Sequence, residues 1–174
     1  MPCVFLIKGK RGRGKTSYAA RLAEELIKSG FRVGGILAAG LWENGVRSGF
    51  DLVVLGSGER LPLCRRNMIS SLSAGPFGFY PEAVEIGKKA LESAGAAGGI
   101  VFLDEVGFME LRGEIWGESL TGLCGKEGIT LVITVREELA GIVKERWKMR
   151  PAVVNLSDDF GEVLEKIKKT RRRA

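Results

Sequence analysis

The 174-residue sequence contains no histidine, and this absence excludes several kinds of chemistry. Without an imidazole there is no His-rich zinc site, no Ser-His or Cys-His nucleophile pair, and no histidine general acid or base. Cysteine is scarce too, because Cys3, Cys64 and Cys124 are widely spaced and odd in number. This usage argues against a thiolate metal site and favours a reducing compartment.

Long apolar runs are also missing. The first apolar run, residues 3–7, is too short for the core of a signal peptide. No stretch approaches the roughly 20 apolar residues of a membrane span. We therefore expect a cytoplasmic protein without a membrane partner. The length suits one domain with a full core, so residues 1–174 are expected to form a single domain.

Basic residues and glycine are abundant. The 27 basic and 21 acidic residues give a formal charge of +6, which suits an anionic ligand but does not distinguish nucleotide, nucleic acid and acidic membrane. The 25 glycines are roughly twice the usual share. Many backbone positions are therefore expected to need positive φ or close approach by another group.

Strand-like and helix-like segments alternate along the chain. Solidly apolar runs predict strands buried on both faces, and apolar residues at helical spacing predict helices. The strand runs lie at residues 3–7, 31–37, 100–103, 131–135 and 152–156, and the helical ones at 16–28, 81–93 and 160–169. This alternation predicts a three-layer α/β fold with a mostly parallel sheet and helices on both faces. A turn at Asn44-Gly45 predicts an inserted β-ribbon at about residues 38–64.

A phosphate-binding motif lies between the first strand and the first helix. Residues 9–16 satisfy G-x-x-x-x-G-K-[ST], so the glycines let backbone N–H groups surround a β-phosphate in front of the helix dipole. We expect Lys15 to neutralise the β and γ oxygens and the Thr16 hydroxyl to bind Mg²⁺. The expected nucleotide-binding residues are Gly9, Lys10, Arg11, Gly12, Arg13, Gly14, Lys15, Thr16 and Ser17.

Basic side chains gather in two places. Those around the phosphate loop repel one another until a triphosphate binds, which predicts tight and salt-sensitive nucleotide binding. The second group is a basic tail at about residues 166–174, where a helix end favours cations through its dipole. The alternative is that this tail binds nucleic acid. Neither aromatic residues between the basic ones nor an RNA-binding motif supports this alternative.

Two acids follow the apolar run 100–103, as in a Walker B motif. Neighbouring residues of a strand point to opposite sides, so Asp104 and Glu105 are expected to have separate roles. By analogy with P-loop enzymes, Asp104 holds Mg²⁺ together with Thr16, and Glu105 orients and deprotonates the attacking water. Thr134, at the end of the next apolar run, is either a γ-phosphate sensor or an ordinary β-branched strand residue.

These motifs resemble the small P-loop nucleoside-triphosphatases related to the human cancer-related nucleoside-triphosphatase, over most of the chain. Besides the phosphate loop, the resemblance rests on Gly35, Thr134 and the motifs at residues 47–52 (RSGFDL), 77–80 (FGFY), 104–111 (DEVGFMEL) and 154–157 (VNLS). It implies a RecA-like sheet. It also implies slow, Mg²⁺-dependent hydrolysis of ATP, GTP and other nucleoside triphosphates to the diphosphate and phosphate, with loose base selectivity.

The chain departs from this family at a few positions. Ala39 or Gly40, and Trp42, stand where the family has an acid and an arginine, and Phe108 replaces its lysine. Trp42 either stacks on a nucleobase or is an ordinary aromatic residue. Arg47 is a candidate catalytic arginine acting as an internal finger, or else a strand-face arginine. Glu110 matches the family's second acid, whose role the sequence does not give.

Two other functions remain open at this point. One is a nucleotide-binding accessory or switch protein, like the small GTP-binding factors of molybdenum-cofactor assembly. The other is a small-molecule kinase, for which Arg136, Arg146 and Arg150 offer the arginines of a lid. The sequence does not determine the oligomeric state.

Overall fold

The computed structural model describes residues 1–173, and its nine strands form one sheet in the order β5-β6-β4-β3-β2-β7-β8-β1-β9. The strands are β1 Cys3–Gly9, β2 Val33–Glu43, β3 Val46–Leu55, β4 Arg60–Arg66, β5 Ser73–Ala74, β6 Phe77–Phe79, β7 Gly99–Val106, β8 Ile129–Arg136 and β9 Ala152–Asn155. Strands β2, β7, β8, β1 and β9 pair in parallel. The pairs from β2 to β5 are antiparallel, so the sheet as a whole is mixed.

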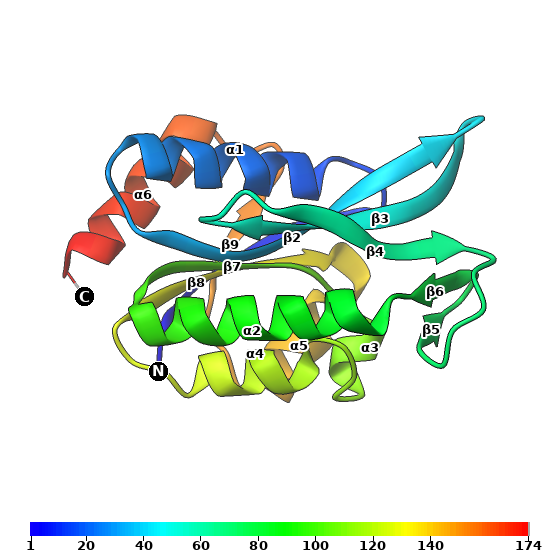
Figure 1. Ribbon diagram of the computed structural model, residues 1–174. Helices are drawn as coiled ribbons and strands as arrows, with labels where there is room; N and C mark the ends of the chain where they lie inside the picture. Colours follow the sequence, from blue (N-terminus) through cyan, green and yellow to red (C-terminus); the bar gives the residue numbers. More distant parts are fainter. Residues whose placement is uncertain (174) are drawn as a thin grey trace.

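Helices cover both faces of the parallel part, which gives the expected three layers (Figure 1). One face carries α1 Lys15–Lys28 and α6 Phe160–Arg173. The other carries α2 Pro81–Ala97, α3 Phe108–Leu111, α4 Gly117–Cys124 and α5 Ala140–Arg146, the last preceded by a short 3-10 turn, Glu137–Leu139. Both ends of the described chain lie on the side of the molecule opposite the tip of the β2–β3 ribbon (Figure 1).

The apolar runs form strands because both of their faces are buried. In β1, Val4 and Leu6 pack toward α2 and α4, whereas Phe5 and Ile7 pack toward α1 and α6. Alternate side chains of a strand point to opposite faces, so a solidly apolar run suits a central strand of a three-layer fold. Burial of each such side chain stabilises the fold by about 1.5–3 kcal/mol.

The ribbon is an extension of the main sheet. The start of β2 pairs with β7, up to the pair Ile36 with Leu103, and the rest of β2 pairs with β3. Asn44 and Gly45 both have positive φ, 48° and 75°, which is the backbone of a tight two-residue hairpin turn. The segment at 38–64 therefore adds antiparallel strands beside β2. Strands β6 and β5 continue this antiparallel pairing, so parallel pairing does not dominate the whole sheet.

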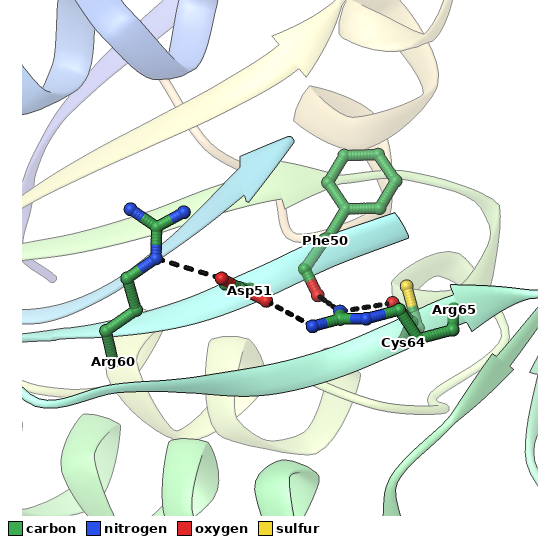
Figure 2. Close-up of polar contacts among 5 residues, drawn as sticks. All are labelled: Phe50, Asp51, Arg60, Cys64 and Arg65. Carbon is green, nitrogen blue, oxygen red and sulfur yellow. Dashed lines mark hydrogen bonds and ion pairs between the residues drawn. The ribbon is translucent and has the colours of Figure 1, made fainter. Parts of the chain in front are cut away.

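An ion-pair network ties β3 to β4 (Figure 2). Asp51 accepts hydrogen bonds from Arg60 at 2.9 Å and from Arg65 at 2.7 Å. Arg65 also donates to the carbonyls of Phe50 and Cys64, both at 2.8 Å. Burial raises the pKa of Asp51, but the two arginines outweigh it and the pKa is lowered. The motif at residues 47–52 thus stabilises the ribbon at this point.

Two helices are longer than the sequence pattern predicts. The helix expected to end at residue 93 continues to Ala97, because its small residues allow close packing: a β-carbon on Gly34 would lie 2.8 Å from that of Ala94. The basic tail is the last part of α6 as far as Arg173, and Arg171 donates to the carbonyl of Gly128 at 3.0 Å. Ala174 and the side chain of Arg173 lie outside the described residues.

Within residues 1–173, each helix falls short of the length and apolar character that crossing a membrane requires.

Candidate active site

The phosphate loop connects β1 to α1 at the carboxyl edge of the parallel strands. Gly12 and Gly14 have φ of 72° and 92°, a left-handed conformation that strains other residues. Lys15 is 3% exposed, and its Nζ donates to the carbonyl of Lys10 at 3.2 Å. The ammonium group therefore lies back over its own loop, where bound phosphate oxygens would meet it. Lys10, Arg11 and Arg13 are exposed around it.

Asp104 lies at the end of β7, where β2 separates from it, and is almost completely buried. The N–H of Ala38, just beyond the last β2–β7 pair, donates to Oδ2 of Asp104 at 3.0 Å. Oδ1 accepts a hydrogen bond from the N–H of Glu105 at 3.0 Å and another from the Thr134 hydroxyl. The carboxylate thus accepts the Ala38 N–H, which has no backbone partner on β7, and its hydrogen bonds hold it in one orientation.

The electrostatics around Asp104 suit a cation. Burial and then the Glu105 carboxylate raise the pKa of Asp104 to about 6, against hydrogen bonds from Thr134, Ala38 and Thr16. A positive ion beside this carboxylate would relieve the cost of its charge. The Thr16 hydroxyl and the Asp104 carboxylate are both oxygen ligands. Mg²⁺ in nucleotide sites is typically bound by one or two such protein ligands, and phosphate oxygens and water complete its coordination shell. The residues therefore fit Mg²⁺.

Glu105 lies in a bulge of β7. Leu103 pairs with Ile133 and Val106 with Val135, so two acids stand opposite the single residue Thr134. Glu105 has a φ of 61°, a left-handed conformation that costs a non-glycine residue about 1–2 kcal/mol. Unlike Asp104, it is partly exposed. Strain of this kind is typical of functional positions, and here it separates the environments of two adjacent acids.

Thr134 links the two acids. Its hydroxyl donates to Asp104 and accepts the N–H of Glu105 at 2.9 Å. It reaches both because β8 lies between β1 and β7 in the sheet. Its hydroxyl proton is thus used by Asp104, which makes orientation of the acids a simpler role for Thr134 than sensing a γ-phosphate.

Arg47 lies near the start of β3, among aromatic side chains of the ribbon. Its guanidinium stacks over the rings of Trp42 at 4.2 Å and Phe50 at 4.8 Å. A β-carbon on Gly40 would lie 1.1 Å from Nη1, so only glycine leaves room for this arrangement. Burial chiefly lowers the pKa of Arg47, the Glu105 carboxylate opposes this, and the charge of Arg11 adds to it. Arg47 is therefore an electrostatic neighbour of both the phosphate loop and Glu105.

Glu110 is a buried carboxyl group whose surroundings the sequence did not disclose. Its Oε2 accepts the N–H of Gly107 at 2.8 Å, and the backbone amides of Glu110 and Trp116 also bond to it. Burial, opposed by these amides, raises its pKa to about 7. Glu110 thus fixes the start of α3 and the turn that leads to α4.

The three arginines considered for a kinase lid are not equivalent. Arg136, at the end of β8, lines a pocket of about 470 Å³ together with Arg11 and Glu105. Arg146 stacks over Trp147 at 5.4 Å. The sequence patterns did not reveal this pocket, nor the part played by the backbone of Ala38, because neither depends on a recognisable run of residues.

The phosphate loop follows β1, the buried acid Asp104 lies near the end of β7, and β8 lies between these two strands in the sheet. This arrangement defines a P-loop nucleoside-triphosphatase of the RecA-like kind. The family model described as NTPase matches residues 4–167, and the chain belongs to this family. The family expected from the motifs is therefore confirmed.

Relatives along nearly the whole chain include nucleoside-triphosphatase THEP1 of Methanopyrus kandleri, 28% identical over 154 residues, covering 88% of this chain and 85% of the relative. THEP1 of Pyrococcus abyssi is 30% identical over 173 residues, covering 95% and 92%. The solution structure of a human cancer-related nucleoside triphosphatase has a TM-score of 0.72 at 25% identity, covering 100% and 99%. The crystal structure of THEP1 from Aquifex aeolicus, at 21% identity and a TM-score of 0.71, covers 94% and 96% and shares the fold.

Proposed function

We propose that this protein is a Mg²⁺-dependent nucleoside-triphosphatase that hydrolyses ATP, GTP and other nucleoside triphosphates to the diphosphate and phosphate. The observation that carries the proposal is the bulge of β7, which directs a strained, partly exposed Glu105 beside the buried Asp104 at the edge of the phosphate loop. The relatives' names, all nucleoside-triphosphatases, support the same activity.

In the proposed reaction the loop amides and Lys15 hold the β- and γ-phosphates, and Thr16 and Asp104 hold Mg²⁺. The ion would neutralise charge that develops on the phosphate oxygens. Glu105 orients a water molecule and accepts its proton as the water oxygen bonds to the γ-phosphorus and the bond to the diphosphate breaks. Thr134 keeps the two acids in place through its bonds to Asp104 and to the Glu105 N–H.

Arg47 is proposed to act as an internal arginine finger. Its electrostatic interaction with Glu105 and with Arg11 of the phosphate loop supports this role. Arginine fingers contribute about 10³ to 10⁵ in rate in related phosphoryl-transfer enzymes. We expect Arg47→Ala to lower kcat severely while nucleotide affinity changes much less, and Arg47→Lys to recover part of kcat. Unchanged turnover in a folded Arg47→Ala protein would remove Arg47 from the mechanism.

The activity is tested by phosphate release from ATP, GTP, CTP and UTP, each with and without Mg²⁺. We expect release only with Mg²⁺, from all four nucleotides, and a fall of about 10² or more in Glu105→Gln. Glu138→Gln is the matched control, because Glu138 is an exposed glutamate outside the site. Equal release by the wild type and Glu105→Gln would contradict the proposal and favour a nucleotide-binding accessory protein.

A further inference from the structure

The pocket of about 470 Å³ lies between α3 and the antiparallel strands of the sheet. Its walls are mainly apolar and include Phe50, Leu63, Phe77, Phe79, Met109 and Trp116. Its volume lies in the range of about 300–1,000 Å³ that small-molecule sites occupy. An apolar, partly enclosed cavity of this size is suited to an organic molecule with a flat apolar body.

One end of this pocket meets the proposed site of hydrolysis. Arg11, Glu105 and Arg136 line that end, whereas Lys15 and Thr16 are not among the lining residues that the structure describes. A triphosphate bound along the phosphate loop would therefore end at the pocket without filling it. The γ-phosphate and Glu105 together would form its polar wall.

The exposed rim of the pocket includes one aromatic side chain. Phe108, at the start of α3, lines the pocket and is 57% exposed. An exposed aromatic ring beside an apolar cavity gains from a ligand that covers it.

We propose that the pocket binds a small organic molecule with a flat apolar body and one hydroxyl group, and that this hydroxyl donates to Glu105 in place of the attacking water. The apolar walls hold the body of the ligand, and Glu105, at the end next to the phosphate loop, accepts a hydrogen bond from the hydroxyl. The ligand binds together with the nucleoside triphosphate. Because it displaces the water, it lowers kcat for phosphate release without raising KM. This effect on kcat rests on the proposed function of Glu105.

Binding is tested directly with 2-naphthol, which has a flat apolar body and one hydroxyl. Equilibrium dialysis against protein loaded with Mg²⁺ and a non-hydrolysable ATP analogue is expected to give one bound 2-naphthol per chain. Ala74→Trp, which places an indole in the pocket, should weaken binding at least about tenfold. Ala96→Trp, at an exposed helical position, is the matched control and should leave the affinity unchanged.

Phe108→Lys provides a second variant, because an exposed rim position carries little risk of misfolding. It should also weaken 2-naphthol binding. Displacement of 2-naphthol by the nucleotide would overturn the proposal, since the pocket would then belong to the nucleotide site. Equal affinity in the wild type, Ala74→Trp and Phe108→Lys would overturn it too.

The effect on turnover is measured as phosphate release at increasing 2-naphthol. We expect kcat to fall as the pocket fills, with KM for ATP unchanged, and to resist 2-naphthol in Ala74→Trp. Binding without any effect on kcat would overturn the placement of the hydroxyl at Glu105. The dialysis does not depend on turnover, so absence of 2-naphthol binding would contradict the proposed ligand site alone. Full hydrolysis by Glu105→Gln would instead contradict the proposed function.

Discussion

The backbone strain at Glu105 leads to a prediction that separates stability from activity. A left-handed conformation costs an L-residue about 1–2 kcal/mol, and glycine avoids this cost. Glycine also loses about 0.5–1 kcal/mol more conformational entropy on folding. The difference predicts that Glu105→Gly is more stable than Glu105→Gln by up to about 1.5 kcal/mol. Glutamine is the reference because it removes the charge and keeps the strained backbone.

The assay is thermal unfolding of both variants at one pH without nucleotide. For a domain of this length, the expected difference corresponds to a Tm up to about 6 °C higher for Glu105→Gly. Both variants should lose phosphate release by about 10² or more. A Glu105→Gly protein less stable than Glu105→Gln would refute the reasoning about strain. Retained hydrolysis in both would refute the role of Glu105 as the base.

Three further predictions concern stability and charge. In urea unfolding, Gly35→Ala should destabilise the protein by about 3 kcal/mol or more, because φ is 101° and a β-carbon would lie 2.0 Å from the Phe102 carbonyl oxygen. Gly122→Ala is the contrasting change, because Gly122 lies in α4 and a β-carbon added there would meet open space. It should stabilise the protein by up to about 1 kcal/mol. The raised pKa of Glu110, about 7, means that folding favours the protonated carboxyl group. The contribution of this group to the free energy of unfolding is therefore fully present below pH 4.5 and is lost as the pH rises through 7. This loss is on the order of 3 kcal/mol, and Glu110→Gln should flatten the pH dependence of unfolding between about pH 5 and 8; an equally steep dependence would contradict the assignment. The Kd for Mg-ATP should rise between about 0.05 and 0.5 M salt, and less steeply in Arg11→Ala, since Arg11 is exposed beside the phosphate loop; parallel salt dependences would exclude Arg11 from the effect.

Local sequence signals predicted the elements that carry the phosphate site. The strand at residues 3–7, the glycine loop and the helix after it are consecutive, so their relation follows from the chain itself. Asn44-Gly45 marked its hairpin because both residues tolerate positive φ. Asp159, immediately before the last helix, is a residue type that favours capping, and its carboxylate accepts the N–H of Glu162 at 2.9 Å.

Other elements were missed or cut short. The short helices α3, α4 and α5 have too few turns to show a clear apolar period, and their length depends on packing against the sheet. The end of α2 contains small residues that resembled a flexible linker, although they allow the helix to lie close to Gly34. The strands β4 to β6 pair with neighbours that no local pattern identifies.

The sequence by itself determined the family, the α/β class and the identity of the residues at the phosphate loop and near the end of β7. These features depend on residue types at fixed spacing along the chain. Only the tertiary structure decided that Ala38, Thr134 and Asp104 share hydrogen bonds, that the charges of Arg47 and Glu105 interact, and that an apolar pocket opens beside them. The physical reason is that these contacts join strands and loops far apart in sequence, whose neighbours are fixed by strand order and by a bulge in β7.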